Sequence, residues 1–212
     1  MKITIIYDNT SIRNDLQPDW GFSAVVEFKE RKILFDAGAS GTILLSNMQK
    51  LGISPKEIQD VFISHNHFDH IGGLSSFIEQ NNSVKLWIPP SFRGVKSIKD
   101  IIKMKDPGKL YEGIYSTGEI EEIEQSLCVK TEKGIMIIVG CSHPRMECIL
   151  QVASQFGRVY GILGGLHGNG PKSLKGLDFI CPTHCSQYKS EIKSLYPERY
   201  VEGGVGRIIE VD

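Results

Sequence analysis

The sequence predicts an α/β fold, a sandwich of strands with helices on the outside. The N-terminal third favours strands, because β-branched and aromatic residues form short runs that end at turn residues. Strand-like and helix-like segments then alternate along the chain, in two roughly similar halves. With 212 residues, the chain is long enough for one sizeable core, so we expect a single domain over residues 1–212.

The first half of the chain predicts five strands and three helices. Apolar residues in Thr42–Leu51 recur at helical spacing and stop before Gly52. Ser54 and Glu57 form a capping-box pattern, which predicts a short helix that begins at Pro55. A further helix is expected over Gly73–Gln80, and the strands are expected over Lys2–Tyr7, Phe22–Phe28, Lys32–Phe35, Asp60–Ser64 and Val84–Ile88.

The second half begins with a segment of weak periodicity. Residues 91–118 contain many lysines and scattered glycines, so we expect a surface excursion, helical around Val95–Met104. Gln125–Thr131 and Gly134–Val139 predict a hairpin. The remaining expected elements are a helix over Pro144–Phe156, strands over Arg158–Leu163 and Leu177–Cys181, a helix over Ser186–Leu195 and a final strand over Gly206–Val211.

The composition indicates which classes of partner and which cellular location to expect. The net charge is −1, from 24 basic and 25 acidic residues, so no global field favours nucleic acid or an anionic membrane. Five cysteines, an odd number, without a secretory signal at the start indicate reduced thiols. No apolar run approaches the length of a membrane span. We therefore expect a soluble, cytoplasmic protein that acts on a small molecule; its oligomeric state is not indicated.

Four side chains of metal-ligand type fall within six residues, in the motif His65-x-His67-x-Asp69-His70. A chance match in a chain of this composition is on the order of one in several thousand. Imidazole and carboxylate bind borderline divalent metals such as Zn²⁺. In an irregular loop, the two halves of the motif can face different ions. The motif therefore predicts a two-metal centre, with His65 and His67 at one ion and Asp69 and His70 at the other.

The chain has six histidines, and the three outside this motif share one context. His143, His167 and His184 each follow an apolar, strand-like run. Any one of them alone is more simply explained as an ordinary hydrogen-bonded histidine. Ligands at strand ends can converge on one edge of a sandwich, however, and loops carry function on such a scaffold. We therefore predict that all three contribute to the metal centre.

These motifs resemble the metallo-β-lactamase superfamily over nearly the whole chain. In that family an Asp at the end of an early strand precedes the HxHxDH motif, and three further ligands each follow a strand. The corresponding positions here are Asp36, residues 65–70, His143, His167 and His184. The resemblance implies an αββα four-layer sandwich and a metal-dependent hydrolase. It also implies two cations at one edge, the first on His65, His67 and His143 and the second on Asp69, His70 and His184.

Several sequence motifs are similar to those of one subgroup of this superfamily, described as dihydropterin ribofuranosyl-aminobenzene phosphate synthases. They are Tyr7–Thr10, Gly140–Pro144, Gly164–His167 and Pro182–Cys185. The chain departs from the broad family at His167, where a bridging Asp is usual. It departs from the subgroup at Arg145, where Gly is common, and in the short connection Gly168–Gly176. His167 has two possible roles, as a terminal ligand or as a general acid.

The resemblance implies hydrolysis by a hydroxide generated at two divalent cations, which we expect to be Zn²⁺, with Mn²⁺ or Fe²⁺ as alternatives. Asp69 is expected to orient the hydroxide, and Asp69 and His167 are the candidate catalytic residues. Asp36 and Asp8 are candidates to support ligand histidines; each is also explained as a turn residue after a strand. Four cysteines are expected to be core or supporting thiols rather than nucleophiles: Cys141, Cys148, Cys181 and Cys185.

The expected substrate is a small ester that carries a phosphate or carboxylate. Arg145, at the start of a helix, and Lys172 and Lys175 are candidates to bind its anionic group, although each is also explained as a solvated surface charge. Three alternatives remain open. One is a mononuclear iron redox enzyme similar to persulfide dioxygenases, and another is a metal-binding protein without catalysis. The third is a nuclease, which the nearly neutral charge argues against.

Overall fold

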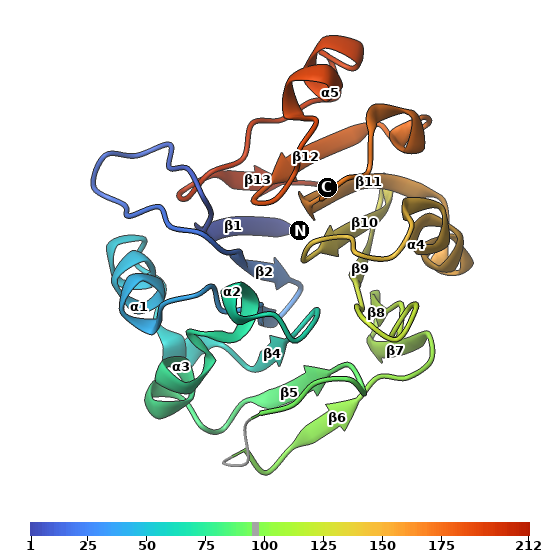
Figure 1. Cartoon of the computed structure of the whole chain (residues 1–212). Helices are drawn as coiled ribbons and strands as arrows, with labels where there is room; N and C mark the ends of the chain where they lie inside the picture. Colours follow the sequence, from blue (N-terminus) through green and yellow to red (C-terminus); the bar gives the residue numbers. More distant parts are fainter. Residues whose placement is uncertain (95–97) are drawn as a thin grey trace.

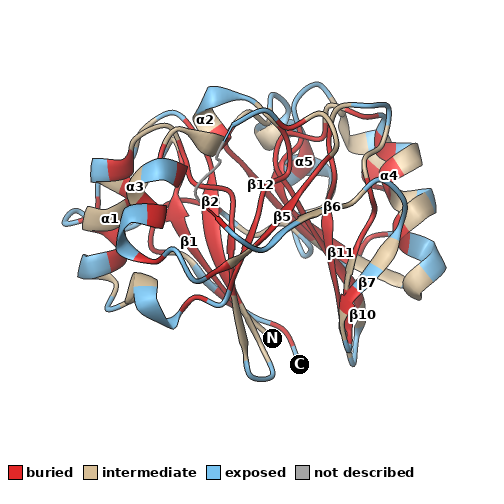
Figure 2. Cartoon of the chain, turned by 90° about the horizontal axis from the view of Figure 1, so that it is seen from below, coloured by how far each residue is buried: buried red, intermediate tan, exposed pale blue. Residues whose placement is uncertain are grey.

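The computed structural model describes residues 1–94 and 98–212. Two β-sheets face each other, and helices cover the outer face of each sheet (Figure 1). From one side of the molecule to the other, the layers are helices, the first sheet, the second sheet and helices (Figure 2). The predicted αββα sandwich is confirmed.

The first sheet contains seven strands in the described part of the chain, in the order β13-β1-β2-β3-β4-β5-β6. β1, β2 and β3 pair antiparallel, as the predicted hairpin requires, and β3 to β6 pair parallel. The C-terminal strand joins the other side of β1, so the two chain ends lie together. The strands are β1 Lys2–Tyr7, β2 Ser23–Phe28, β3 Arg31–Phe35, β4 Asp60–Phe62, β5 Lys85–Ile88, β6 Ile101–Lys103 and β13 Ile208–Glu210.

The second sheet contains six strands among the described residues, in the order β12-β11-β10-β9-β8-β7. β9 and β10 form the predicted hairpin, and β10, β11 and β12 are parallel. The strands are β7 Gly108–Tyr111, β8 Ile114–Ser116, β9 Leu127–Thr131, β10 Gly134–Val139, β11 Val159–Gly165 and β12 Phe179–Thr183.

Three apolar layers hold the sandwich together. One layer lies between the sheets and includes Phe35, Phe62 and Ile138. A second lies between the first sheet and its helices, and a third between the second sheet and its helices. The α-helices are α1 Gly41–Lys50, α2 Phe68–Ile71, α3 Leu74–Gln80, α4 Met146–Ala153 and α5 Lys189–Leu195, and the 3₁₀ turns are η1 Pro55–Glu57, η2 Ser154–Phe156 and η3 Pro171–Leu174.

The expectation of a helix around Val95–Met104 is wrong. Residues 95–97 lie outside the described residues, and Ile101–Lys103 forms β6 at the edge of the first sheet. The rest of the expected surface excursion supplies β7 and β8 at the edge of the second sheet. Edge strands are short and half exposed, so their apolar pattern is weak. The helix expected after Ser54 is a single 3₁₀ turn, in which the Ser54 hydroxyl accepts the Lys56 N–H at 3.3 Å.

Parallel strands bring distant segments to one edge of the sandwich. β3 and β4 of the first sheet and β10, β11 and β12 of the second end at the edge that carries α2, opposite the chain ends (Figure 2). The histidine motif and the other histidines follow these strand ends. Among the described residues, no helix has the length and apolar character needed to cross a membrane.

Candidate metal centre

The histidine motif passes from the end of β4 into the first turn of α2. His65 follows the strand, His67 precedes the helix, and Asp69 and His70 lie in the first turn. Two glycines let this turn approach the loop after β3: a Cβ on Gly72 would lie 2.2 Å from the Ala39 carbonyl oxygen, and one on Gly73 2.2 Å from that of Ala37. The glycines therefore bring the motif close to the rest of the edge.

His65, His67 and His143 form a first cluster of ligand atoms. The Nδ1 atom of His67 lies 3.1 Å from His65 Nε2 and 3.1 Å from His143 Nε2. One possible ligand atom from each residue lies within 4.8 Å of the others. The structure thus brings His143 next to His65 and His67, although His143 lies 78 residues after His65 in the sequence.

Asp69, His70 and His184 form a second cluster. Asp69 Oδ2 lies 3.1 Å from His184 Nε2 and 3.7 Å from His70 Nε2. Their ligand atoms also lie within 4.8 Å of one another. His184 Nε2 is buried and forms no hydrogen bond with the described residues. An unpaired buried ring nitrogen is costly, and a cation beside Asp69 and His70 would satisfy it.

Three polar groups behind the clusters fix the orientation of the imidazoles. The Asn9 amide donates to the His184 carbonyl oxygen at 3.2 Å, which directs its own oxygen to His184 Nδ1 at 2.9 Å. Because an amide oxygen only accepts, His184 Nδ1 carries the proton and its Nε2 is left with a lone pair. His70 Nδ1 lies 2.7 Å from Asp36 Oδ2, and His65 Nδ1 lies 2.9 Å from the Ser64 hydroxyl. The Nε2 atoms of these rings are therefore available as ligands.

Asp36 and Asp8 are both fully buried behind the centre. Asp36 accepts the Ser64 N–H and hydroxyl, each at 2.7 Å, and burial raises its pKa to about 7. Asp8 accepts the backbone N–H of His184 at 2.8 Å, and burial raises its pKa also. Asp36 and His184 have φ of 52° and 44°. Such strained backbone is costly for residues other than glycine and clusters at functional sites.

The protonation states suit cation binding. Burial lowers the pKa of His65 and of His70 to about 3, so both rings are neutral at neutral pH. Burial opposes ionisation of Asp69, but its side-chain contact with His184 and its electrostatic interactions with His70 and His184 hold its pKa below the ordinary value. Neutral imidazoles and an ionised carboxylate are the forms that bind metals. The donor set therefore fits divalent cations.

Glu124 is a buried part of the site that sequence reasoning missed. Its Oε1 accepts the backbone N–H groups of Gly140, Cys141 and Ser142 at 3.0–3.1 Å, and its Oε2 accepts that of His143 at 3.0 Å. Burial raises the pKa of Glu124, but the electrostatic interaction with His65 and these hydrogen bonds outweigh burial and lower the pKa. Glu124 shapes the loop that carries His143. It follows a run of surface glutamates in the sequence, so no local pattern distinguishes it.

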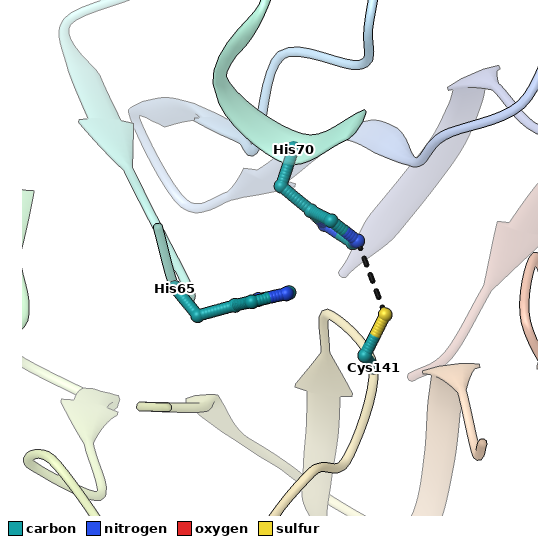
Figure 3. Close-up of side chains that lie close together, drawn as sticks. All are labelled: His65, His70 and Cys141. Atoms are coloured by element: carbon teal, nitrogen blue, oxygen red, sulfur yellow. Dashed lines mark hydrogen bonds between the residues drawn. The ribbon is translucent and has the colours of Figure 1, made fainter. Parts of the chain in front are cut away.

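Cys141 and Cys185 lie at the centre, whereas the other cysteines lie away from it. Cys141 Sγ lies 3.2 Å from His70 Nε2, and the side chains of His65, His70 and Cys141 converge from three elements (Figure 3). A hydrogen bond with Cys141 lowers the pKa of Cys185 to about 6, and the same bond and burial raise that of Cys141. Cys181 is buried in the core, and Cys148 lies 3.7 Å from Glu121.

The remaining predicted residues lie at the rim. His167 is exposed, and its ring centroid is 5.0 Å from that of His143. It contributes to none of the ligand clusters found among the described residues. Arg145 precedes α4 and its Nε lies 3.2 Å from Glu121 Oε1. Lys172 and Lys175 are exposed, in and after η3.

Comparisons with known proteins identify a matching family model and several similar proteins. Residues 18–95 match the model of the metallo-beta-lactamase superfamily. The chain is 28% identical to the 7,8-dihydropterin-6-methyl-4-(beta-D-ribofuranosyl)-aminobenzene-5'-phosphate synthase of Methanocaldococcus jannaschii, over 94% of this chain and 91% of the relative.

Two solved structures share the fold over nearly the full length of this chain and of their own chains. One is a metal-dependent hydrolase of the beta-lactamase superfamily, with a TM-score of 0.80 and 24% identity, covering 100% of this chain and 99% of that one. The other is Zn²⁺-bound PqqB from Methylobacterium extorquens, with a TM-score of 0.69 and 12% identity, covering 100% of both. The chain therefore has the metallo-β-lactamase fold, and its resemblance to that superfamily is confirmed.

Proposed function

We propose that the chain is a metal-dependent hydrolase with two divalent cations, acting on a small ester that carries an anionic group. The observation that carries the proposal is the pair of adjacent three-residue clusters, one of three histidines and one with Asp69. His65 and His70 are neutral, because burial lowers their pKa to about 3, and His184 Nε2 is buried without a hydrogen bond, as cation binding requires. When bound, the cations would make hydroxide available near neutral pH and polarise the ester oxygen.

The residues around the clusters suit this reaction. Asp69 stays ionised and can accept a hydrogen bond from the attacking water. His167 stands at the rim with an exposed ring beside His143, where it can donate a proton to the leaving group. We therefore assign His167 the role of general acid. The zinc in the PqqB structure and the nitrogen-rich donor set favour Zn²⁺.

A cavity of about 370 Å³ is lined by residues 168–173, which directly follow His167, and by Glu147. Lys172 and Glu147 give its wall one basic and one acidic side chain. A larger cavity, of about 850 Å³, is lined by Met1 and Asp212 and lies at the opposite end of the sandwich, where the chain ends meet. We propose that Lys172, with Arg145 and Lys175, binds the anionic group.

A second candidate function is a synthase reaction like that named for the archaeal relative, which covers 94% of this chain. Arg145 and the short connection after His167 separate this chain from the subgroup pattern, so we rank it second. The two candidates share the metal centre and differ in the reaction that the substrate undergoes.

Metal analysis and a panel of esters test the proposal. Protein purified without added metal should contain about two divalent cations per chain and hydrolyse a phosphodiester, a phosphomonoester or a carboxylate-bearing ester. His65→Ala should lose most activity and at least one cation while keeping its circular dichroism spectrum, because the core is built without the metals. Asn14→Ala, an exposed change, is the matched control.

Other outcomes separate the alternatives. One iron per chain with oxygen uptake on a persulfide would replace hydrolysis by redox chemistry. Two cations without hydrolysis of any ester in the panel would favour the synthase reaction. Unfolding of the metal-free protein at ambient temperature would make the site structural.

A further inference from the structure

We propose that Cys141 is a metal ligand, a thiolate that joins Asp69, His70 and His184 at the second cation. The inference rests on the metal-binding part of the proposed function. It adds sulfur to a site that otherwise offers only nitrogen and oxygen. It also explains how the centre is completed where His167 replaces the family's bridging carboxylate.

The distances around the sulfur are those between ligands of one cation. With metal bonds of about 2.0–2.1 Å to nitrogen and about 2.3 Å to sulfur, two tetrahedral ligands lie about 3.5 Å apart. Cys141 Sγ lies 3.2 Å from His70 Nε2. It is also within 4.8 Å of a ring nitrogen of His184 and of one of His65. The sulfur therefore lies between the two clusters, nearest a ligand nitrogen of the second.

Other groups that could complete the site are committed elsewhere. Glu124 accepts four backbone N–H groups with its two oxygens, and Asp36 holds Ser64 and His70. His167 contributes to none of the clusters of the described residues. A thiolate is a strong ligand for Zn²⁺, and Cys141 Sγ lies 3.2 Å from His70 Nε2 and within 4.8 Å of ligand nitrogens of His65 and His184.

The fold places Cys141 through close backbone approaches. A Cβ on Gly140 would lie 2.1 Å from the Ser64 hydroxyl and 3.0 Å from His65 Nδ1. A Cβ on Gly165 would lie 2.7 Å from Cys185 Sγ and 3.2 Å from Cys141 Cα. The next residue, Ser142, has a φ of 55°. Both glycines and the strained turn bring the loop, and with it the sulfur, against the histidines.

Cys185 is a neighbour of this ligand. Its sulfur lies 3.8 Å from the Cys141 carbonyl oxygen and contacts His167. Cys185 forms a ligand cluster with Cys141 and His184, but it belongs to no cluster with His65 or His70 among the described residues. Cys141 shares clusters with His65, His70 and His184, so it is the sulfur that lies near ligand nitrogens of both histidine clusters. With Asp69 and Cys141 both negative, the second position favours Zn²⁺, Co²⁺ or Fe²⁺ over Mn²⁺ or Mg²⁺.

Cobalt spectroscopy tests the assignment independently of activity. Metal-free, reduced wild-type protein titrated with Co²⁺ should develop a near-ultraviolet thiolate-to-cobalt charge-transfer band. Cys141→Ser should lose the band and bind the second Co²⁺ at least about tenfold more weakly. Cys185→Ser and Cys148→Ser, the matched controls, should keep it. X-ray absorption of the zinc-loaded wild type should show a sulfur neighbour that Cys141→Ala lacks, and circular dichroism checks that each variant is folded.

The outcomes distinguish this inference from the proposed function. Two Co²⁺ bound without a charge-transfer band, or a band that Cys185→Ser removes and Cys141→Ser keeps, overturns the role of Cys141 and leaves the hydrolase proposal standing. Failure of the wild type to bind Co²⁺ or Zn²⁺ at all overturns the hydrolase proposal itself.

Discussion

Asn9 supports the candidate metal centre through its contacts with His184. Its amide holds both the ring and the backbone carbonyl of His184. Asn9→Ala removes the acceptor that fixes the proton on His184 Nδ1, so Nε2 loses its defined lone pair. We expect affinity for the second cation to fall about 10–100-fold, with the first cation unaffected. Competition with a chromophoric chelator measures both.

Asn14→Ala is the control for this prediction, because Asn14 is exposed in the same N-terminal loop. Wild-type affinity for both cations in Asn9→Ala would contradict the role of Asn9.

His167 has two candidate roles, as a terminal metal ligand or as a general acid. An imidazole cannot bridge two cations as a carboxylate does, because its lone pairs diverge. Its exposed ring beside His143 favours proton transfer over ligation. We expect His167→Ala to retain both cations and to lower kcat by about 100-fold or more.

Metal analysis and kinetics on the same preparation distinguish the two roles of His167. Loss of a cation in His167→Ala, with tighter binding of the second cation in His167→Asp, would identify it as a ligand. Full metal content together with full activity would exclude both roles.

The loop after β10 depends on a single buried carboxylate. Glu124 binds four successive backbone N–H groups between Gly140 and His143. Glu124→Gln keeps the size of the side chain but replaces one acceptor oxygen with a donor, which leaves buried N–H groups unpaired. We expect unfolding of the metal-free protein to become easier by about 2–4 kcal/mol, measured with urea.

The neighbouring Glu122 provides the control, since it is exposed and Glu122→Gln removes the same charge. Equal stability of Glu124→Gln and the wild type would show that the loop does not depend on this carboxylate.

The elements that the sequence predicts well are those with strong local patterns. The hairpins of β2 with β3 and β9 with β10, and the helix α1, have clear periodicity and turn residues. The strands at 101–116 were missed because half-exposed edge strands have little apolar pattern. At the centre, histidine spacing predicts the clusters. The position of Cys141 follows from close backbone approaches at Gly140 and Gly165, and that of Glu124 from its hydrogen bonds to the loop 140–143, and neither is visible in a local sequence pattern.

At the scale of the whole molecule, a polar contact joins the two sheets far from the metal centre. Asp60 begins β4, at the end of the strand opposite His65. Its buried carboxylate accepts Trp87 Nε1 at 2.8 Å within the first sheet and the Tyr111 hydroxyl at 2.7 Å from the second. The guanidinium of Arg31 lies over the Tyr111 ring, 4.0 Å from its centroid. The contact therefore ties the sheets together at the edge without ligands.

Tyr111→Phe should weaken this tie in a pH-dependent way. Burial and the hydrogen bond to Asp60 raise the pKa of Tyr111 to about 12 from 10.0. A raised pKa means that folding favours the protonated hydroxyl, so its contribution is complete below pH 10 and is lost as the pH rises from 10 towards 12. At neutral pH the variant should lose at most about 1 kcal/mol of unfolding free energy, because the hydroxyl is half-buried.

Urea unfolding from pH 7 to 12 should therefore show a steeper alkaline loss of stability in the wild type than in Tyr111→Phe. Tyr188→Phe, in which an exposed ring is changed, should follow the wild type. Parallel pH profiles for wild type and Tyr111→Phe would mean that the hydroxyl does not join the sheets.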